Sequence, residues 1–181
     1  MAECYPGVEK LVSQSSHCSE SELGTDDISQ CLNLSLSETI RNEPMLISAS
    51  FFWSDAINAF MFGHGPMTPS LLDVMMLTGL KIHAPDRPFH LIEKASFKIE
   101  MKNIGGWKGY ISKNMKTGSV STREHTTFLN MWLEKIIFCG KTVGPTNNNF
   151  KLAETLADGN LVPLGKHLLG AVYHLLHQVL V

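Results

Sequence analysis

The sequence has no long hydrophobic run, no excess of basic residues and no signal-peptide pattern at its start. No apolar stretch approaches the ~20 residues of a membrane span, and Glu3, Pro6 and Glu9 stand where a signal peptide needs an apolar core. We therefore expect an intracellular protein. Lysine and arginine total 15 against 17 acidic residues, a formal net charge of -2, so general binding to nucleic-acid phosphates is not favoured.

Cysteines are few, and their spacing fits neither a metal site nor a disulfide framework. None belongs to a C-x-x-C pair or lies near paired histidines; they are Cys4, Cys18, Cys31 and Cys139. We expect free thiols in a reducing compartment.

Residues 1–40 contain eight serines and no sustained hydrophobic period. Burying their short apolar clusters would not offset the entropy of ordering the chain, which predicts a disordered leader. Residues 41–181 are predicted to form one incomplete domain, mainly α-helical, with five or six helices and one small β-hairpin. The chain ends inside an apolar helix, whose stripe is predicted to lack its packing partner.

Apolar spacing and capping signals locate the individual elements. The hairpin is expected around Gly63–Gly65, between two short apolar pieces. Thr68 and Gly79 are predicted to cap the helix over residues 69–78, and Ser121 with Glu124 forms a capping box that opens the helix over residues 121–138. Helices are predicted over residues 48–60, 69–78, 121–138, 150–156 and 163–181, with one or two helical turns around 107–111 and a weaker helical signal over 91–102.

Several ordered strings after Pro44 resemble the plant mobile domain, and together they span about residues 45–181. They resemble the N-terminal part of that domain, which is longer than this chain. The strings are Phe52–Phe60, Gly63–Pro69, Leu71–Val74, Leu77–Leu80, Gly105–Ile111, Arg123–His125, Phe128–Leu133, Phe138–Gly140 and Leu164–Ala171.

The resemblance implies a nuclear protein without catalysis, linked to meristem maintenance and transposon silencing. It also implies a protein partner, for which a plant serine/threonine phosphatase is one candidate. The family is often labelled aminotransferase-like, but we find no Schiff-base lysine with a phosphate cup and an acidic partner for a pyridoxal ring. The alternative is a transposon-derived DNA-binding protein or an inactive transposon remnant.

Candidate metal and nucleotide sites are weak. His167, His174 and His177 fall on similar sides of the last helix, but no carboxylate or cysteine nearby completes a ligand set. Gly63–Pro66 lacks the spacing and lysine of a P-loop and favours a structural turn. Gly105–Gly109 pairs Trp107 with Lys108, but a packed tryptophan is a commoner reading than base stacking.

Candidate nucleophiles and acids are equally weak, so we predict no catalytic, cofactor-binding or metal-binding residue. Cys139 lies about four turns from His125, too far for a thiol–imidazole pair within one helix. Asp55 is expected to face solvent and Asp73 to support the start of its helix. If the protein were an enzyme, its structure would bring at least two candidate side chains within hydrogen-bonding reach in a pocket, from the set Asp55, Asp73, His125, Cys139, His174 and His177. If it bound DNA, its structure would cluster four basic side chains on one face: Lys108, Lys113, Lys116 and Arg123.

Overall fold

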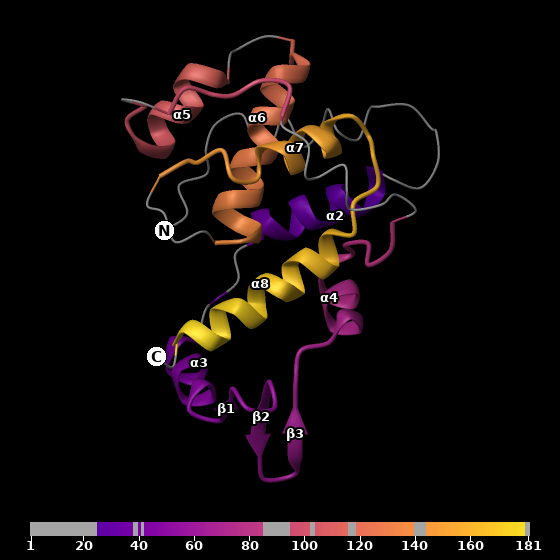
Figure 1. Cartoon of the computed structure of the whole chain (residues 1–181), viewed down its shortest axis with the longest axis vertical. Helices are drawn as coiled ribbons and strands as arrows, with labels where there is room; N and C mark the ends of the chain where they lie inside the picture. Colours follow the sequence, from indigo (N-terminus) through magenta and orange to yellow (C-terminus); the bar gives the residue numbers. More distant parts are fainter. Residues whose placement is uncertain are drawn as a thin grey trace. The chain divides into compact units, whose positions relative to one another are not determined.

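The structure, a computed structural model, describes residues 25–37, 40, 42–84, 95–101, 104–115, 119–139 and 144–179. The chain divides into two compact units (Figure 1). The helical unit combines Met1–Ser29 with His83–Val162, and the sheet unit combines Gln30–Ile82 with Pro163–Val181. Each unit is therefore assembled from segments that are distant in the sequence.

The helical unit is built around α6 (Thr122–Trp132), which packs against α7 (Phe150–Ala157). Ser121 caps α6, and its hydroxyl accepts a hydrogen bond from the Glu124 backbone at 3.2 Å, as the sequence predicts. Every residue from Thr126 to Glu134 is buried. Because a helix buried on all sides lies in the centre of a core, α6 organises this unit.

The predicted helix over 121–138 continues beyond α6 as the π-helix η2 (Leu133–Ile137). Its wider turn is closed by the Phe138 backbone amide, which donates to the Leu133 carbonyl at 2.8 Å. Ile136, which regular helical spacing would place on the same side as the buried Trp132 and Leu133, is 42% exposed. The extra residue per π turn moves the following side chains out of the 3.6-residue register that the prediction assumed.

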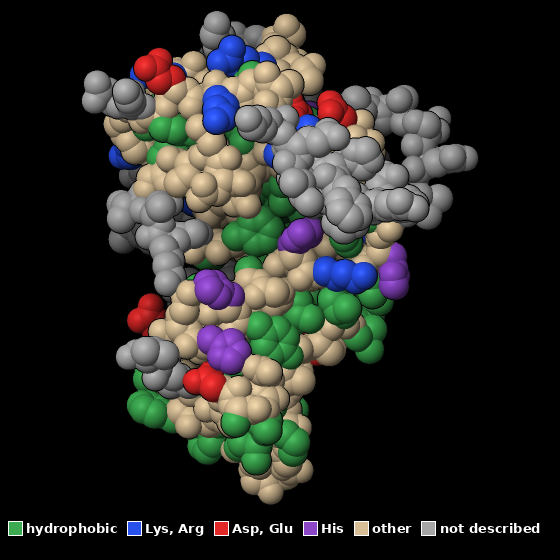
Figure 2. All heavy atoms as spheres, viewed as in Figure 1, with side chains coloured by type: hydrophobic (Ala, Val, Ile, Leu, Met, Phe, Trp, Pro, Cys, Tyr) green, Lys and Arg blue, Asp and Glu red, His purple; other side chains and the backbone are tan. Residues whose placement is uncertain are grey.

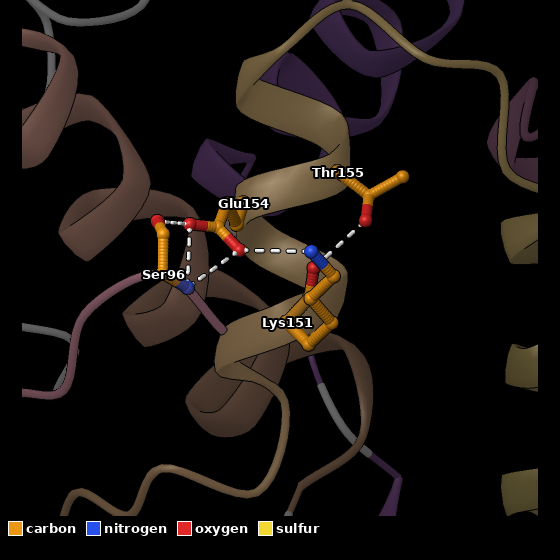
Figure 3. A network of polar contacts seen from close by, with 4 residues as sticks. All are labelled: Ser96, Lys151, Glu154 and Thr155. Carbon is orange, nitrogen blue, oxygen red and sulfur yellow. Dashed lines mark hydrogen bonds and ion pairs between the residues drawn. The ribbon is translucent and has the colours of Figure 1, made fainter. Parts of the chain in front are cut away.

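Two buried glutamates fasten loops to the helices of the helical unit. Glu154 on α7 accepts hydrogen bonds from the Ser96 backbone amide, at 3.0 Å, and from the Ser96 hydroxyl, and pairs with Lys151 at 3.1 Å (Figure 3). Glu134 accepts from the Thr146 amide at 2.7 Å and from its hydroxyl at 2.5 Å. Both carboxylates thus accept hydrogen bonds from backbone amides in loops, where no helix or strand supplies a partner.

The glycine-rich string before α5 (Gly106–Asn114) makes a tight backbone turn. Gly105 and Gly106 have φ of 73° and 69°, a region that side chains with a Cβ rarely adopt. The turn brings the Ile104 carbonyl against Gly109, where an added Cβ would overlap its oxygen. Trp107 packs its ring edge-on against Tyr110, with centroids 5.8 Å apart. The half-buried Trp107 ring thus packs within its own helix, which is the reading that the sequence favours over base stacking.

Replacing Gly109 with alanine should lower the free energy of unfolding by about 1–3 kcal/mol, because the Ile104 backbone would have to shift. Gly170 lies inside a helix with open space around its missing Cβ, so Gly170→Ala should instead stabilise the protein by about 0.5–1 kcal/mol. Urea unfolding followed by circular dichroism measures both. Stabilisation by both substitutions would contradict the close approach.

The sheet unit contains a three-stranded antiparallel sheet in the order β1-β2-β3. The predicted hairpin around Gly63–Gly65 is confirmed as β2 and β3, and β1 adds a strand that the sequence did not predict. Its elements are the part of α2 (Thr25–Leu36) from Gln30 onward, α3 (Glu43–Ser50), β1 (Trp53–Ser54), β2 (Ala59–Phe62), β3 (Gly65–Met67), α4 (Leu71–Thr78) and α8 (Leu164–Val179). α4 packs against α8.

The predicted helix over 48–60 is wrong. The helix α3 begins earlier, with Asn42 as its cap and Pro44 in its first turn, where proline is tolerated. It ends at Ser50, and Asn58, with φ of 53°, turns the chain between β1 and β2. The aromatic residues that suggested helical spacing instead meet across strands, since Trp53 pairs with Phe60 at a ring distance of 5.0 Å.

Other boundaries differ locally from prediction. The cap of α4 is Ser70 rather than Thr68, and α4 ends at Gly79 (φ 71°) as predicted. Residues 95–101 are not helical, contrary to the predicted helix over 91–102. The helices predicted around 107–111, 150–156 and 163–181 are confirmed as α5, α7 and α8. α2 occupies part of the predicted leader, whereas residues 1–24 lie outside the described residues.

Candidate interaction surface

Residues 42–80 of the sheet unit expose an unusual amount of hydrophobic side chain. Of the 16 large hydrophobic residues that are exposed in the described part of the chain, 11 lie in this stretch. We call them the apolar surface: Met45, Leu46, Ile47, Phe51, Phe52, Ile57, Met61, Met67, Leu72, Met76 and Leu77. Figure 2 shows hydrophobic side chains over α4 and over the sheet. Soluble monomeric proteins rarely expose so many large hydrophobic side chains in one segment, and where they do, the exposed surface is commonly an interaction site.

The helix α4 presents the most exposed part of the apolar surface. Six of its eight residues are apolar, a composition that normally belongs to a helix buried on all sides. Val74 is buried, yet Leu72 is 60% exposed and Met76 and Leu77 are each 73% exposed. One side of α4 therefore packs inside the sheet unit, and the other side exposes hydrophobic side chains that another molecule could cover.

Both ends of α4 are fixed, so its exposed side is preformed. Ser70 and Asp73 make a reciprocal capping box, in which the Asp73 carboxylate accepts from the Ser70 amide at 2.7 Å and from its hydroxyl at 2.6 Å. These hydrogen bonds lower the pKa of Asp73, with the side-chain bond as the larger cause. The prediction that Asp73 supports the start of its helix is confirmed.

Tyr173 of α8 attaches the segment that precedes α4. Its hydroxyl donates to the Pro69 carbonyl at 2.9 Å and lies in contact with the Thr68 hydroxyl. Thr68, predicted as a helix cap, instead donates to the Asn58 carbonyl at 2.9 Å. The connection between β3 and α4 is thus held by the Tyr173 side chain of α8 and by the backbone carbonyl of Asn58.

Asp55 and His177 are two of the weighed candidates, and they contact each other in the described residues. The Asp55 carboxylate accepts from the Trp53 indole at 2.8 Å and lies 2.9 Å from Nδ1 of His177. The side chains are 51% and 40% exposed, so Asp55 faces solvent as predicted but also joins β1 to α8. The ring of Trp53 lies edge-on to His177, with centroids 5.9 Å apart.

Of the other histidine and cysteine candidates, His174 and Cys139 make contacts close by in the sequence, and His125 is half-buried. His174 is hydrogen-bonded to Gln178 on its own helix, and Figure 2 shows histidines along α8. No three His, Cys, Asp or Glu side chains gather as a metal site in the described ranges. Cys139 is exposed, and its thiol donates a hydrogen bond to the Ile136 carbonyl at 3.3 Å. Burial lowers the pKa of His125.

Cys31 and Cys139 are free thiols, as predicted, and Cys4 and Cys18 lie outside the described residues. Cys31 is buried, and this burial raises its pKa to about 11. Its thiol is therefore protonated and unreactive at neutral pH. Cys31 therefore fits the packing role of a small buried side chain.

The basic residues weighed for DNA binding belong to the helical unit. Lys108 and Lys113 lie on α5, and the Arg123 guanidinium lies over the Phe97 ring, 5.2 Å from its centroid. Lys116 lies outside the described residues. Stacking on Phe97 gives Arg123 a partner within its own unit.

Sequence reasoning did not find the apolar surface. It predicted an uncovered stripe on the last helix, whereas on α8 Leu175 is exposed and most other apolar residues are half-buried. The signal that could have found the surface is the composition of Leu71–Thr78, which is apolar around the whole helix although both of its ends are clearly capped.

Helices that dominate both units, a small antiparallel sheet and an exposed apolar surface define a mainly α-helical protein whose candidate site is a surface for contact. The sequence model of the plant mobile domain matches residues 27–180, so the chain belongs to the plant mobile domain family. The searches of curated proteins and of solved structures gave no match. None of the helices within the described ranges has the length and apolar character to cross a bilayer.

Proposed function

We propose that this chain is a non-catalytic nuclear interaction module, acting in meristem maintenance and transposon silencing, and that its apolar surface binds a protein partner. The observation that carries the proposal is the exposed side of α4, where Leu72, Met76 and Leu77 face outward from a helix with two fixed ends. A rigid exposed apolar surface loses little conformational entropy when a partner covers it.

The surroundings of the candidate catalytic residues support a role without catalysis. The Asp55 carboxylate is shared between the Trp53 indole and His177, and this group joins a strand to a helix. An acid or base in catalysis needs a substrate within hydrogen-bonding reach and a site that excludes water. The half-exposed pair instead resembles the ion pairs that position secondary structure at protein surfaces.

The resemblance to the family supplies the nuclear location and one candidate partner, a plant serine/threonine phosphatase. The second reading, a transposon-derived DNA-binding protein or an inactive remnant, predicts no dependence of partner binding on α4. The net charge of -2 gives this reading little electrostatic support.

Affinity capture from plant nuclei tests the proposal. The tagged full chain should recover a phosphatase or a silencing factor, and the double substitution Met76→Glu/Leu77→Glu should reduce this recovery at least tenfold, because charges would be buried in an apolar contact. Ile136→Glu, at an exposed apolar residue of the helical unit, is the matched control and should leave recovery unchanged. Recovery of chaperones alone, or equal recovery by the double variant, would favour the remnant.

A further inference from the structure

The apolar surface lies in a segment that carries charge of one sign. Residues 42–80 contain three acidic residues, Glu43, Asp55 and Asp73, and no lysine or arginine. All three acids are exposed. The chain as a whole is nearly balanced, with 15 basic and 17 acidic residues, so this segment differs from the rest in having no lysine or arginine, and its net charge is negative. Cationic side chains of a partner that covers it would meet carboxylates and no lysine or arginine of the segment.

The same segment is rich in methionine. It holds five of the nine methionines of the chain, and four of them are exposed: Met45, Met61, Met67 and Met76. The unbranched thioether side chain adapts to apolar groups of different shape, and such side chains are common where a protein binds apolar faces of helices. The surface thus combines adaptable apolar contacts with fixed negative charges.

The acids stand beside the most exposed hydrophobic residues. Glu43 is in the first turn of α3, which also exposes Met45, Leu46 and Ile47. Asp73 is in the first turn of α4, one turn before Leu77 on the same side of the helix. A lowered pKa keeps Asp73 ionised at neutral pH. An apolar contact with α3 or α4 therefore brings cationic groups of the partner next to a carboxylate.

We propose that the apolar surface binds a basic amphipathic helix of a partner protein. The apolar face of that helix packs on α4 and the sheet, and its lysine or arginine side chains pair with Glu43, Asp55 and Asp73. This inference rests on the proposed function and specifies the chemistry of its partner. Two other occupants fit less well, because an anionic bilayer repels an acidic surface and a second copy would place like charges face to face.

Binding of defined peptides to the full chain tests the inference. The probe is a fluorescent 18-residue helix of leucine and lysine with one apolar face, and the controls are the same peptide with glutamate for lysine and a scrambled peptide of the same composition. Fluorescence anisotropy at low salt should give an affinity for the basic amphipathic peptide at least tenfold above that for either control. Raising the salt concentration should weaken this binding.

Two pairs of substitutions locate the binding. Glu43→Gln/Asp73→Asn keeps an acceptor oxygen at each position and should weaken binding about fivefold. The matched control Glu100→Gln/Asp158→Asn removes two exposed acids of the helical unit and should leave the affinity unchanged. Met76→Ser/Leu77→Ser removes apolar contact without adding charge and should weaken binding more than tenfold, with circular dichroism showing that each variant keeps its helical content.

The outcomes separate this inference from the proposed function. Equal binding of the acidic and basic amphipathic peptides, abolished by Met76→Ser/Leu77→Ser, would overturn the basic partner and leave the apolar surface as a contact site. Peptide binding that is unchanged in Met76→Ser/Leu77→Ser, or sedimentation showing a dimer that this variant dissociates while no peptide binds, would also overturn the inference. The capture experiment with nuclear partners then decides the proposed function by itself.

Discussion

Replacement of Trp132 by alanine is expected to lower the free energy of unfolding by about 3–5 kcal/mol. Trp132 is 1% exposed and lies near the end of α6, inside the run of buried residues that continues to Glu134. Removing its ring would leave a cavity that the surrounding side chains can fill only in part. This is the largest effect we expect from a single side-chain truncation in the protein.

Urea unfolding followed by circular dichroism measures this effect. Phe51→Ala is the matched control, since that ring is 78% exposed in the sheet unit and its loss should change stability by no more than about 0.5 kcal/mol. A loss below about 1 kcal/mol for Trp132→Ala would show that α6 is not the centre of the helical unit.

Glu134→Ala is expected to cost about 2–4 kcal/mol, because it removes a carboxylate that holds a loop and a helix start together. The carboxylate accepts from the amide and the hydroxyl of Thr146, and from the Asn149 amide at 3.5 Å. Asn149 precedes α7 and makes no capping bond with its own side chain. Glu134, which lies in η2, therefore accepts a hydrogen bond at the start of α7 that a capping side chain would normally accept.

Conservative and exposed substitutions make this prediction specific. Glu134→Gln keeps one acceptor oxygen and should lose less than half as much as Glu134→Ala, whereas Glu100→Ala, at an exposed position, should be close to neutral. Hydrogen exchange should also show faster exchange of the first amides of α7 in Glu134→Ala. Unchanged exchange there, with a general loss of stability, would mean that Glu134 contributes burial alone.

The apolar surface and these buried carboxylates belong to different units and have different consequences. The buried carboxylates of Glu134 and Glu154 find their hydrogen-bond partners inside the helical unit, so both residues contribute to stability. In the sheet unit the hydrophobic residues of α3 and α4 remain at the surface. Variants of the first kind should alter unfolding, and variants of the second kind should alter association with little change in unfolding.

The candidate site was the least predictable part of the protein. The sequence showed that Leu71–Thr78 is a helix with a glycine end, since these signals are local. Which side of that helix is covered depends on its contact with α8, about 90 residues further along the chain. Periodicity reveals an apolar face but does not reveal whether another segment packs on it, and in α4 every face is apolar.

By itself the sequence determined the family, the mainly helical class, and the helices whose ends are marked by Ser121, Gly79 and Pro163, because capping and apolar spacing act over a few residues. Only the tertiary structure decided that Trp53 and Phe60 meet across strands, that η2 turns Ile136 outward, and that α4 keeps one side uncovered. Those outcomes depend on pairing and packing between distant segments, whose free energy outweighs local preference.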